Sequence, residues 1–287
     1  MEIFYELKNS LKTFKSWLVY GPDKYPAGVD PYAFIRVHNE IHLLQASLNS
    51  IQGIITRGVI GYNDCTDGSE DVILKFCEMN PGFIPVKYEL PVWPPEDKRY
   101  WVNTIDEPYG GLDTYYNYIW DHIPNGEWVI KIDADQIYDR ERLKKLLTLP
   151  RNIQSVVFIP RINLHYQDDR LYLVRSNPLS NVDDHWLLYK TPERRFKLKK
   201  NAPPFSEVWE ILDIGEYESI RVKTLTWHFP FMKSKRCHLA KKDQLVHLDS
   251  EEGEKILSSF SYILSKDMTD SSRIKRYLSD LGVVSFS

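Results

Sequence analysis

Short apolar runs alternate along the chain with segments whose apolar residues recur every three or four positions. A run rich in β-branched residues is typical of a buried strand, and the longer spacing is typical of a helix that packs on a core. The predicted strands are 32–37, 57–62, 84–88, 128–132, 156–162 and 184–189, and the predicted helices are 3–20, 39–53, 69–79, 111–123, 140–148 and one or two within 251–282. Strands that alternate with helices predict an α/β fold with a mostly parallel sheet flanked by helices.

The two ends of the chain differ from this alternating middle. Residues 3–20 have the pattern of an amphipathic helix, which would pack on the domain or, in the alternative, lie on a membrane surface. The proline- and glycine-rich stretch 21–31 then reads as a loop. We therefore predict three parts, which are an N-terminal helix and linker at 1–28, a catalytic domain at 29–240 and a helical extension at 241–287.

Composition narrows the class of protein. A chain of 287 residues with 43% hydrophobic content can bury a large core, which disfavours disorder. The net charge of −3 argues against a general nucleic-acid binder. Three cysteines without a CxxC pair fit a reducing compartment, and the chain shows neither an 18-residue apolar run nor a signal-peptide layout. We expect a cytoplasmic protein without nucleic-acid partners.

Two basic clusters qualify this expectation. Residues 190–200 hold six Lys or Arg against one Glu, and residues 233–242 hold five without an acid. A solvated basic surface is one explanation. The other is a surface that receives an anionic substrate or anionic lipid headgroups, which would place the protein peripherally on the inner face of the inner membrane.

Two acids mark the end of the most apolar strand. Asp133 and Asp135 follow the run 128–132 directly. Burying a carboxylate is costly and two close together repel, so such a pair favours a cation. Because alternate residues of a strand point the same way, the two carboxylates are expected to face one Mn²⁺ or Mg²⁺ ion. The alternative is a solvated turn after a core strand.

Two other predicted strands end in polar residues. Residues 36–40 lie at the end of the first predicted strand and just beyond it, and residues 61–69 do the same for the second. Ser69 is the predicted N-cap of the next helix. In a parallel sheet these ends and Asp133 share one edge, which is where such sheets bind ligands. The three together predict a nucleotide site.

At this point the chain resembles a known family, the Campylobacter-type β-1,4-N-acetylgalactosaminyltransferases, which are GT-A glycosyltransferases with a Rossmann-like fold. The resemblance runs over roughly 31–230, whereas residues 89–110 and those beyond 240 depart from the family pattern. The matching stretches are AFIRVHNE (33–40), RGVIGYNDCTDGSE (57–70), FIPVKY (83–88), YYNY (115–118), EWVIKIDAD (127–135), PRIN (160–163) and WHFP (227–230).

The resemblance implies a UDP-sugar donor bound at the first strand ends. It makes Arg36, Asn39 and Asp64 candidates for the uridine, and adds Tyr116 and Arg161 to the nucleotide-sugar site. Asp64 could instead stabilise an Asx-turn, and Arg161 could form a structural salt bridge or reach a carboxylate of the acceptor.

The resemblance also implies the metal ligands. Asp133 would face the ribose and the metal, Asp135 would bind Mn²⁺ (or Mg²⁺) directly, and His228 would be a third ligand from the far end of the domain. A lone histidine among aromatic residues can also be a core residue, which is the alternative for His228.

An inverting transfer needs a carboxylate base on the face opposite UDP. Asp184 is the family match for that base, Asp183 is its neighbour, and Glu207 and Glu210 are the remaining candidates. An exposed Asp-Asp turn is the alternative for the first two.

The expected function is metal-dependent, inverting transfer of GalNAc from UDP-GalNAc to a galactose of a sialylated, ganglioside-like lipooligosaccharide. Another UDP-hexose transferase of surface polysaccharide synthesis and a non-catalytic glycan-binding module are the alternatives. A sugar-nucleotide pyrophosphorylase would need a Gly-rich loop that 33–41 lacks, and a phosphatase of the Asp-x-Asp-x-Thr type would need threonine where Ile137 stands.

Overall fold

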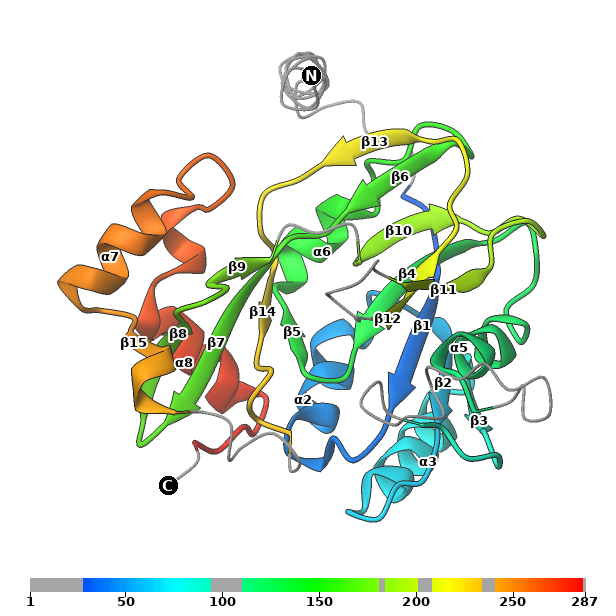
Figure 1. The fold of residues 1–287 in the computed structure, drawn as a ribbon, viewed down its shortest axis with the longest axis horizontal. Coiled ribbons are helices and arrows are strands. Elements are labelled where there is room, and N and C mark those ends of the chain that lie inside the picture. Colours follow the sequence, from blue (N-terminus) through cyan, green and yellow to red (C-terminus); the bar gives the residue numbers. More distant parts are fainter. Residues whose placement is uncertain (1–27, 94–109, 181–183, 201–207, 234–240, 286–287) are drawn as a thin grey trace.

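The computed structural model describes residues 28–93, 110–180, 184–200, 208–233 and 241–285. The predicted helix 3–20, Asp183, Glu207 and most of 89–110 lie outside these residues. The described strands form a seven-stranded sheet, a six-stranded sheet and a two-stranded ribbon (Figure 1).

The seven-stranded sheet is the larger one and carries the Rossmann-like half of the fold. Its strands in spatial order are β13 (Glu218–Arg221), β6 (Ser155–Phe158), β10 (Trp186–Tyr189), β4 (Trp128–Asp133), β1 (Tyr32–Val37), β2 (Arg57–Tyr62) and β3 (Phe83–Lys87). Strands β4, β1, β2 and β3 are parallel to their neighbours in this group, as predicted. Strand β10 runs antiparallel to both β4 and β6.

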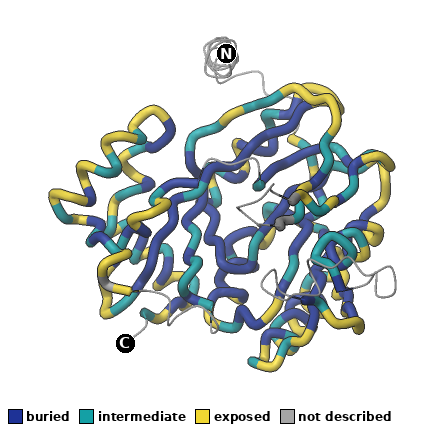
Figure 2. The backbone as a smooth tube through the Cα atoms, in the orientation of Figure 1, coloured by how far each residue is buried: buried dark blue, intermediate teal, exposed yellow. Residues whose placement is uncertain are grey.

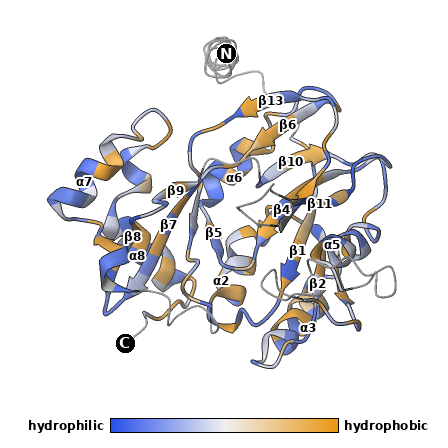
Figure 3. Cartoon of the chain, viewed as in Figure 1, coloured by the Kyte–Doolittle hydropathy of each residue, from blue (hydrophilic) through white to orange (hydrophobic). Residues whose placement is uncertain are grey.

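Both faces of this sheet are covered. Ala33, Ile35 and Val37 point to one face, where α2 (Ile41–Ile51), α3 (Ser69–Met79) and α6 (Arg140–Leu146) complete an apolar cluster. Phe34 points to the other face, which α5 (Leu112–Trp120) and the ribbon of β11 (Phe196–Lys200) and β12 (Val208–Leu212) cover. Burial on both sides explains why the strands read as continuous apolar runs (Figures 2 and 3).

The predicted strand 156–162 is wrong as a single strand. The chain leaves the first sheet after Phe158 and enters the second sheet at Arg161. Pro160 lies at this junction; proline has no N–H to donate to a ladder, so the break falls where a continuous strand would lose a hydrogen bond.

The six-stranded sheet was not predicted. Its strands are β15 (Leu245–His247), β8 (Arg170–Val174), β7 (Arg161–Gln167), β14 (Thr226–His228), β5 (Gln136–Tyr138) and β9 (Leu179–Ser180), with mostly antiparallel pairing. Several of these strands have only two or three residues, too few for a period to register. The predicted C-terminal helices are confirmed as α7 (Glu251–Ser258) and α8 (Ser271–Asp280), and Ile274 and Leu278 of α8 share an apolar cluster with Trp227 of β14. The division of the chain at 28 and 240 stays a prediction.

Ser69 is not the N-cap of α3. Gly68 takes that position with a φ of 93°, and Ser69 is the first helical residue. The Asp67 carboxylate accepts from the backbone N–H of Ser69 (3.0 Å) and from that of Ile41 (3.0 Å). The Ser69 hydroxyl accepts from the N–H of Glu40 (2.9 Å), so the loops that follow β1 and β2 are tied together.

Asp139 anchors the C-terminal helix, and its loss should be costly. Its buried carboxylate caps α6 by accepting from the N–H of Arg142 (3.0 Å) and pairs with Arg273 of α8. We expect Asp139→Ala to lower the free energy of unfolding by about 3 kcal/mol, because a cap and a buried ion pair are lost together. Asp267→Ala, which removes a carboxylate that is 47% exposed, should cost less than about 1 kcal/mol. Urea denaturation measures both, and equal losses would contradict the assignment.

Candidate functional site

The candidate site lies at the carboxyl edge of β1 and β4. Arg36 and Asp133 are register partners at the ends of these parallel strands. Because β10 is antiparallel, its amino end reaches the same edge and brings Asp184 and His185 beside Asp133. We call these four side chains, Arg36, Asp133, Asp184 and His185, the rim.

Asp133 is held by two side chains, Arg36 and His185. Its Oδ1 accepts from Arg36 Nη2 at 3.1 Å, and its Oδ2 lies 2.7 Å from Nε2 of His185. The Arg36 guanidinium in turn lies 3.6 Å from the ring centroid of Tyr116, so Tyr116 supports the arginine by a cation–π contact. Burial alone would raise the pKa of Asp133, but His185, Lys131 and Arg36 outweigh it and hold that pKa well below its usual range.

His185 is fully buried and acts as a neutral bridge. Burial lowers its pKa to about 4. Its Nδ1 lies beside Arg161, and its Nε2 lies 2.7 Å from Asp133 Oδ2 and 2.7 Å from the side-chain nitrogen of Gln136. These contacts hold the ring between Arg161 and Asp133 at the end of β4.

Asp184 faces two cations. Its Oδ1 lies 2.5 Å from Lys131 Nζ, and its Oδ2 lies 3.6 Å from Arg161 Nη1. Burial would raise the pKa of Asp184, but Lys131, His185 and Arg161 together outweigh burial and keep that pKa below its usual range. The side chain is nevertheless 43% exposed, which leaves the ionised carboxylate within reach of a bound ligand.

Asp135 has a different set of partners. The strand ends at Asp133 and the chain turns at Ala134 and Asp135, so strand alternation is not what orients the second acid. The buried Asp135 Oδ2 lies 3.2 Å from Nε2 of His228 and 3.3 Å from Nζ of Lys233. The structure therefore brings Asp135 and His228 together, although they are 93 residues apart in the sequence.

The hydrogen bonds of Asn163 determine the tautomer of His228. The Asn163 amide donates to the carbonyl of Asn177 (2.7 Å), which leaves its side-chain oxygen as an acceptor. That oxygen lies 2.6 Å from Nδ1 of His228, so Nδ1 carries the hydrogen. In a neutral ring the Nε2 lone pair then faces the Asp135 carboxylate. Two acceptors face each other there, and the geometry calls for a cation or a proton between them.

Two of the predicted uridine residues, Asn39 and Asp64, lie in the loops that follow β1 and β2, and the third, Arg36, lies in β1. Asn39 (φ 54°) uses its side-chain oxygen to accept from the backbone N–H of Thr66 at 2.8 Å, so it ties the loops together. Asp64 (φ 44°) is exposed on the second loop. A positive φ is uncommon for a residue with a side chain, and Asn and Asp are among the residues that adopt it most readily.

Several residues of the candidate site were not predicted from the sequence. They are Lys131, His185, Glu40, Lys233 and Asn163, and each contacts a predicted site residue or that residue's partner. Lys131 offered a signal, since a lysine in the middle of a buried strand requires a partner. The other four lie in loops or strands whose neighbours only the fold reveals.

Part of the predicted basic surface is buried. Lys190 and Arg194 belong to the 190–200 cluster, but Lys190 donates to the carbonyls of Trp120 (2.7 Å) and Ile123, and Arg194 donates to those of Tyr189 (2.6 Å) and Ile214 (3.0 Å). The two cations satisfy the backbone and face no solvent. The expectation of a basic surface is wrong for these two residues.

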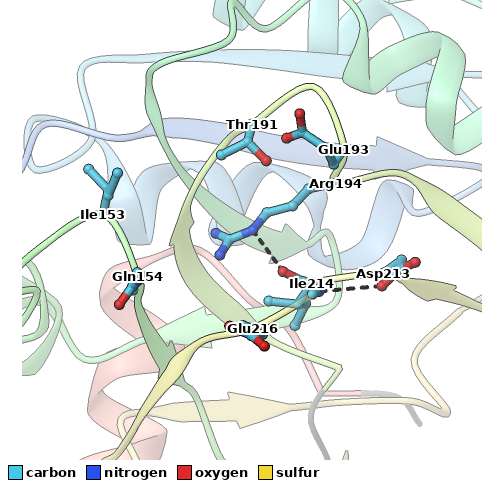
Figure 4. Close-up of a pocket in the computed structure, with 9 residues that line it drawn as sticks. Ile153, Gln154, Thr191, Glu193, Arg194, Asp213, Ile214 and Glu216 are labelled. Carbon is cyan, nitrogen blue, oxygen red and sulfur yellow. Dashed lines mark hydrogen bonds between the residues drawn. The ribbon is translucent and has the colours of Figure 1, made fainter.

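A pocket of about 330 Å³ lies away from the rim (Figure 4). Ile153 precedes β6, Thr191 follows β10 and Glu216 precedes β13, and all three line the pocket. These strand ends lie at the edge of the sheet opposite the rim. The guanidinium of Arg194 lines it but is already bound to backbone carbonyls. The pocket contains none of the predicted site residues.

A family model described as Beta-1,4-N-acetylgalactosaminyltransferase (CgtA) matches residues 14–279. No curated protein sequence matches the chain significantly. Within the described residues, no helix has the length and apolar character needed to cross a bilayer.

Solved structures show distant likenesses. Mannosyltransferase PcManGT from Pyrobaculum calidifontis, in complex with GDP-Man and Mn²⁺, is 19% identical with a TM-score of 0.33; the match covers 53% of this chain and only 42% of that one. HddC from Yersinia pseudotuberculosis is 11% identical with a TM-score of 0.39, over 74% of this chain and 100% of that one. A putative glucose-1-phosphate thymidylyltransferase from Bacillus anthracis is 12% identical with a TM-score of 0.36, over 73% and 93%. Scores this low carry no argument about the reaction.

Proposed function

Because the chain belongs to the β-1,4-N-acetylgalactosaminyltransferase (CgtA) family of glycosyltransferases, we propose that it moves GalNAc from UDP-GalNAc to a galactose of a sialylated lipooligosaccharide, with inversion and with the help of a divalent ion. The observation that supports the ion is the pairing of His228 Nε2 with the Asp135 carboxylate, in a tautomer that leaves two acceptors facing each other.

The donor atoms fit a divalent ion held by few protein ligands. Carboxylate oxygen and imidazole nitrogen are ligands that Mn²⁺ accepts, and substrate phosphates commonly complete such a shell. Among the described residues, no three His, Cys, Asp or Glu side chains gather closely enough to form a complete metal cage. This favours Asp135 and His228 as the protein ligands, with Asp133 behind them and the diphosphate as the remainder. The bound ion would supply charge neutralisation for the departing diphosphate.

Two arginines suit the diphosphate. The Nε groups of Arg36 and Arg161 are buried and have no hydrogen-bond partner in the protein. A buried donor without a partner is costly, and guanidinium groups bind phosphate oxygens well. We assign Arg36 and Arg161 to the phosphates, which would repay this cost on donor binding. Tyr116 supports Arg36, and Asn39 shapes the loop on which Asp64 faces the uracil.

In the proposed reaction the acceptor hydroxyl loses its proton to a carboxylate of the protein. The acceptor oxygen forms a bond to C1 of the sugar, the bond from C1 to the UDP oxygen breaks, and the electron pair leaves with UDP. Asp184 takes the hydroxyl proton, since Lys131 and Arg161 keep its carboxylate ionised and ready to accept. Glu210 of β12 is the other described candidate: burial raises its pKa, and the nearby charges of Arg36, Lys131 and Asp184 influence it.

The acceptor class is proposed from the cationic side chains of the protein. A sialylated glycolipid is anionic, and Arg161 beside the rim is a cation that could attract it. The half-buried Arg195 and the exposed Lys197 are further cations, near Asp213 of the pocket at the opposite edge of the sheet. Both already pair with aspartates, Arg195 with Asp121 and Lys197 with Asp213 at 2.6 Å, so their contribution is a weak, salt-screened one. Peripheral contact with an anionic membrane surface would use the same charges.

The donor is tested by hydrolysis. We expect Mn²⁺-dependent release of UDP from UDP-GalNAc in the absence of acceptor to be faster than from UDP-Gal or UDP-Glc. The three donors share the diphosphate and uridine, so the assay isolates recognition of the sugar. Faster turnover of UDP-Gal or UDP-Glc would refute the GalNAc assignment and leave the UDP site standing.

A further inference from the structure

One lysine lies among the proposed metal ligands. The ammonium of Lys233 is 2.5 Å from Glu40 Oε1 and 3.3 Å from Asp135 Oδ2. The Asp135 oxygen that it contacts is the same one that faces His228 Nε2. The two carboxylates are almost fully buried, with side-chain exposures of 6% for Glu40 and 2% for Asp135, whereas Lys233 is 25% exposed.

This arrangement is that of a cation between two carboxyl groups. Burial raises the pKa of Glu40 to about 8, and the Lys233 ammonium opposes that rise because it favours the ionised form. An ammonium between the two carboxyl groups removes their repulsion without any bound ion. A lysine ammonium is a compact point charge on a flexible stem, so it can leave such a position when a competing cation arrives. Glu40 directly precedes α2, and its backbone N–H donates to the Ser69 hydroxyl, so its backbone is held at the start of the helix.

We propose that Lys233 is a built-in competitor of the divalent ion: its ammonium, with Glu40 as second partner, holds the place of the cation at the Asp135 oxygen that faces His228, and an ion binds there by displacing it. The inference rests on the proposed function for the identity of the site, but it concerns how the ion gains entry. After displacement Lys233 remains beside Glu40, whose carboxylate keeps the extra positive charge balanced. Competition from Lys233 keeps the affinity of the protein for the ion low in the absence of the donor. When the donor binds, its diphosphate supplies the ligands that the protein does not.

The test measures ion binding, not activity. Free Mn²⁺ is titrated with the full chain in the absence of nucleotide and followed by electron paramagnetic resonance, which reports unbound Mn²⁺. We expect Lys233→Met to bind Mn²⁺ at least about tenfold more tightly than the unaltered chain, because a unit charge next to the ion has been removed. Lys255→Met removes an exposed lysine of α7 and is the matched control, with unchanged affinity expected.

Two further variants keep the proposal falsifiable if Lys233→Met folds poorly. Lys233→Gln removes the charge but keeps polar atoms near the carboxylates, and we expect it to tighten Mn²⁺ binding in the same direction. Glu40→Gln leaves Lys233 with Asp135 alone, so Mn²⁺ should bind more weakly than to the unaltered chain. Mn²⁺ should also raise the melting temperature of Lys233→Met more than that of the unaltered chain.

The outcomes separate the two proposals. Equal Mn²⁺ affinity for the unaltered chain and both Lys233 variants overturns the competitor role and leaves the metal-dependent function intact. Weaker binding by the Lys233 variants also overturns it. Mn²⁺ binding by none of the proteins, with or without UDP, overturns both. Tighter binding by the Lys233 variants together with weaker binding by Glu40→Gln supports the proposal.

Discussion

Replacing Asp135 with asparagine should abolish transfer and metal-dependent binding of UDP. Asn keeps the shape of the side chain but removes the charge that faces His228 and the ion. Two unit charges 4 Å apart interact by about 4 kcal/mol at an effective dielectric of about 20, which is roughly a thousandfold in rate if it is realised only in the transition state. We therefore expect kcat for UDP-GalNAc to fall at least about a thousandfold.

Calorimetric titration of UDP with and without Mn²⁺ checks the binding half of this prediction. In the unaltered chain Mn²⁺ should strengthen UDP binding, and in Asp135→Asn it should have no effect. Asp249→Asn, an exposed aspartate before α7, is the matched control and should behave like the unaltered chain. Turnover that survives chelation of divalent ions, or that survives Asp135→Asn, would remove the ion from the mechanism. A glycan-binding module would show no metal-dependent binding of UDP at all.

Replacing Asp184 with asparagine should stop transfer while sparing the donor. A general base contributes about 10²–10⁴-fold, so kcat should fall by that factor, whereas UDP affinity in the presence of Mn²⁺ should stay within about twofold. The reason is positional, since Asp184 contacts Lys131, Arg161 and His185, and of these only Arg161, at 3.6 Å, is assigned to UDP, through its diphosphate. Circular dichroism and thermal melts must accompany the assay, because the substitution leaves the buried Lys131 without its carboxylate partner.

Glu210→Gln is the variant that decides between the two described carboxylates. If Asp184 is the base, Glu210→Gln should retain most of the turnover. A large loss in Glu210→Gln together with near-normal turnover in Asp184→Asn would transfer the role to Glu210.

The pH profile of kcat distinguishes the same two residues without mutation. A base must be deprotonated to act. Lys131, His185 and Arg161 together hold the pKa of Asp184 below its usual range despite burial, so this base would keep kcat level down to about pH 5. Burial raises the pKa of Glu210, so the other base would make kcat fall as the pH drops through that raised value.

Much of the first sheet could be predicted from the sequence. Strands β1, β2, β3 and β4 and helices α2, α3, α5 and α6 were predicted within a few residues, because both faces of the central parallel strands are buried and most of their residues are apolar. The position of Arg36 beside Asp133 also follows from parallel strands that end at one edge. Family membership was likewise readable, since a motif such as RGVIGYNDCTDGSE is long and local.

The tertiary structure alone decided which charges meet. A strand read as parallel would have sent Asp184, at its amino end, to the far edge of the sheet; the antiparallel course of β10 returns it to Asp133. The second sheet carries His228 to Asp135 and Asn163 to His228, and Lys190 and Arg194 turn inward to backbone carbonyls. Strand direction and long-range pairing leave no trace in local periodicity, because a residue's hydrophobicity records how deeply it is buried and not which neighbour it meets there.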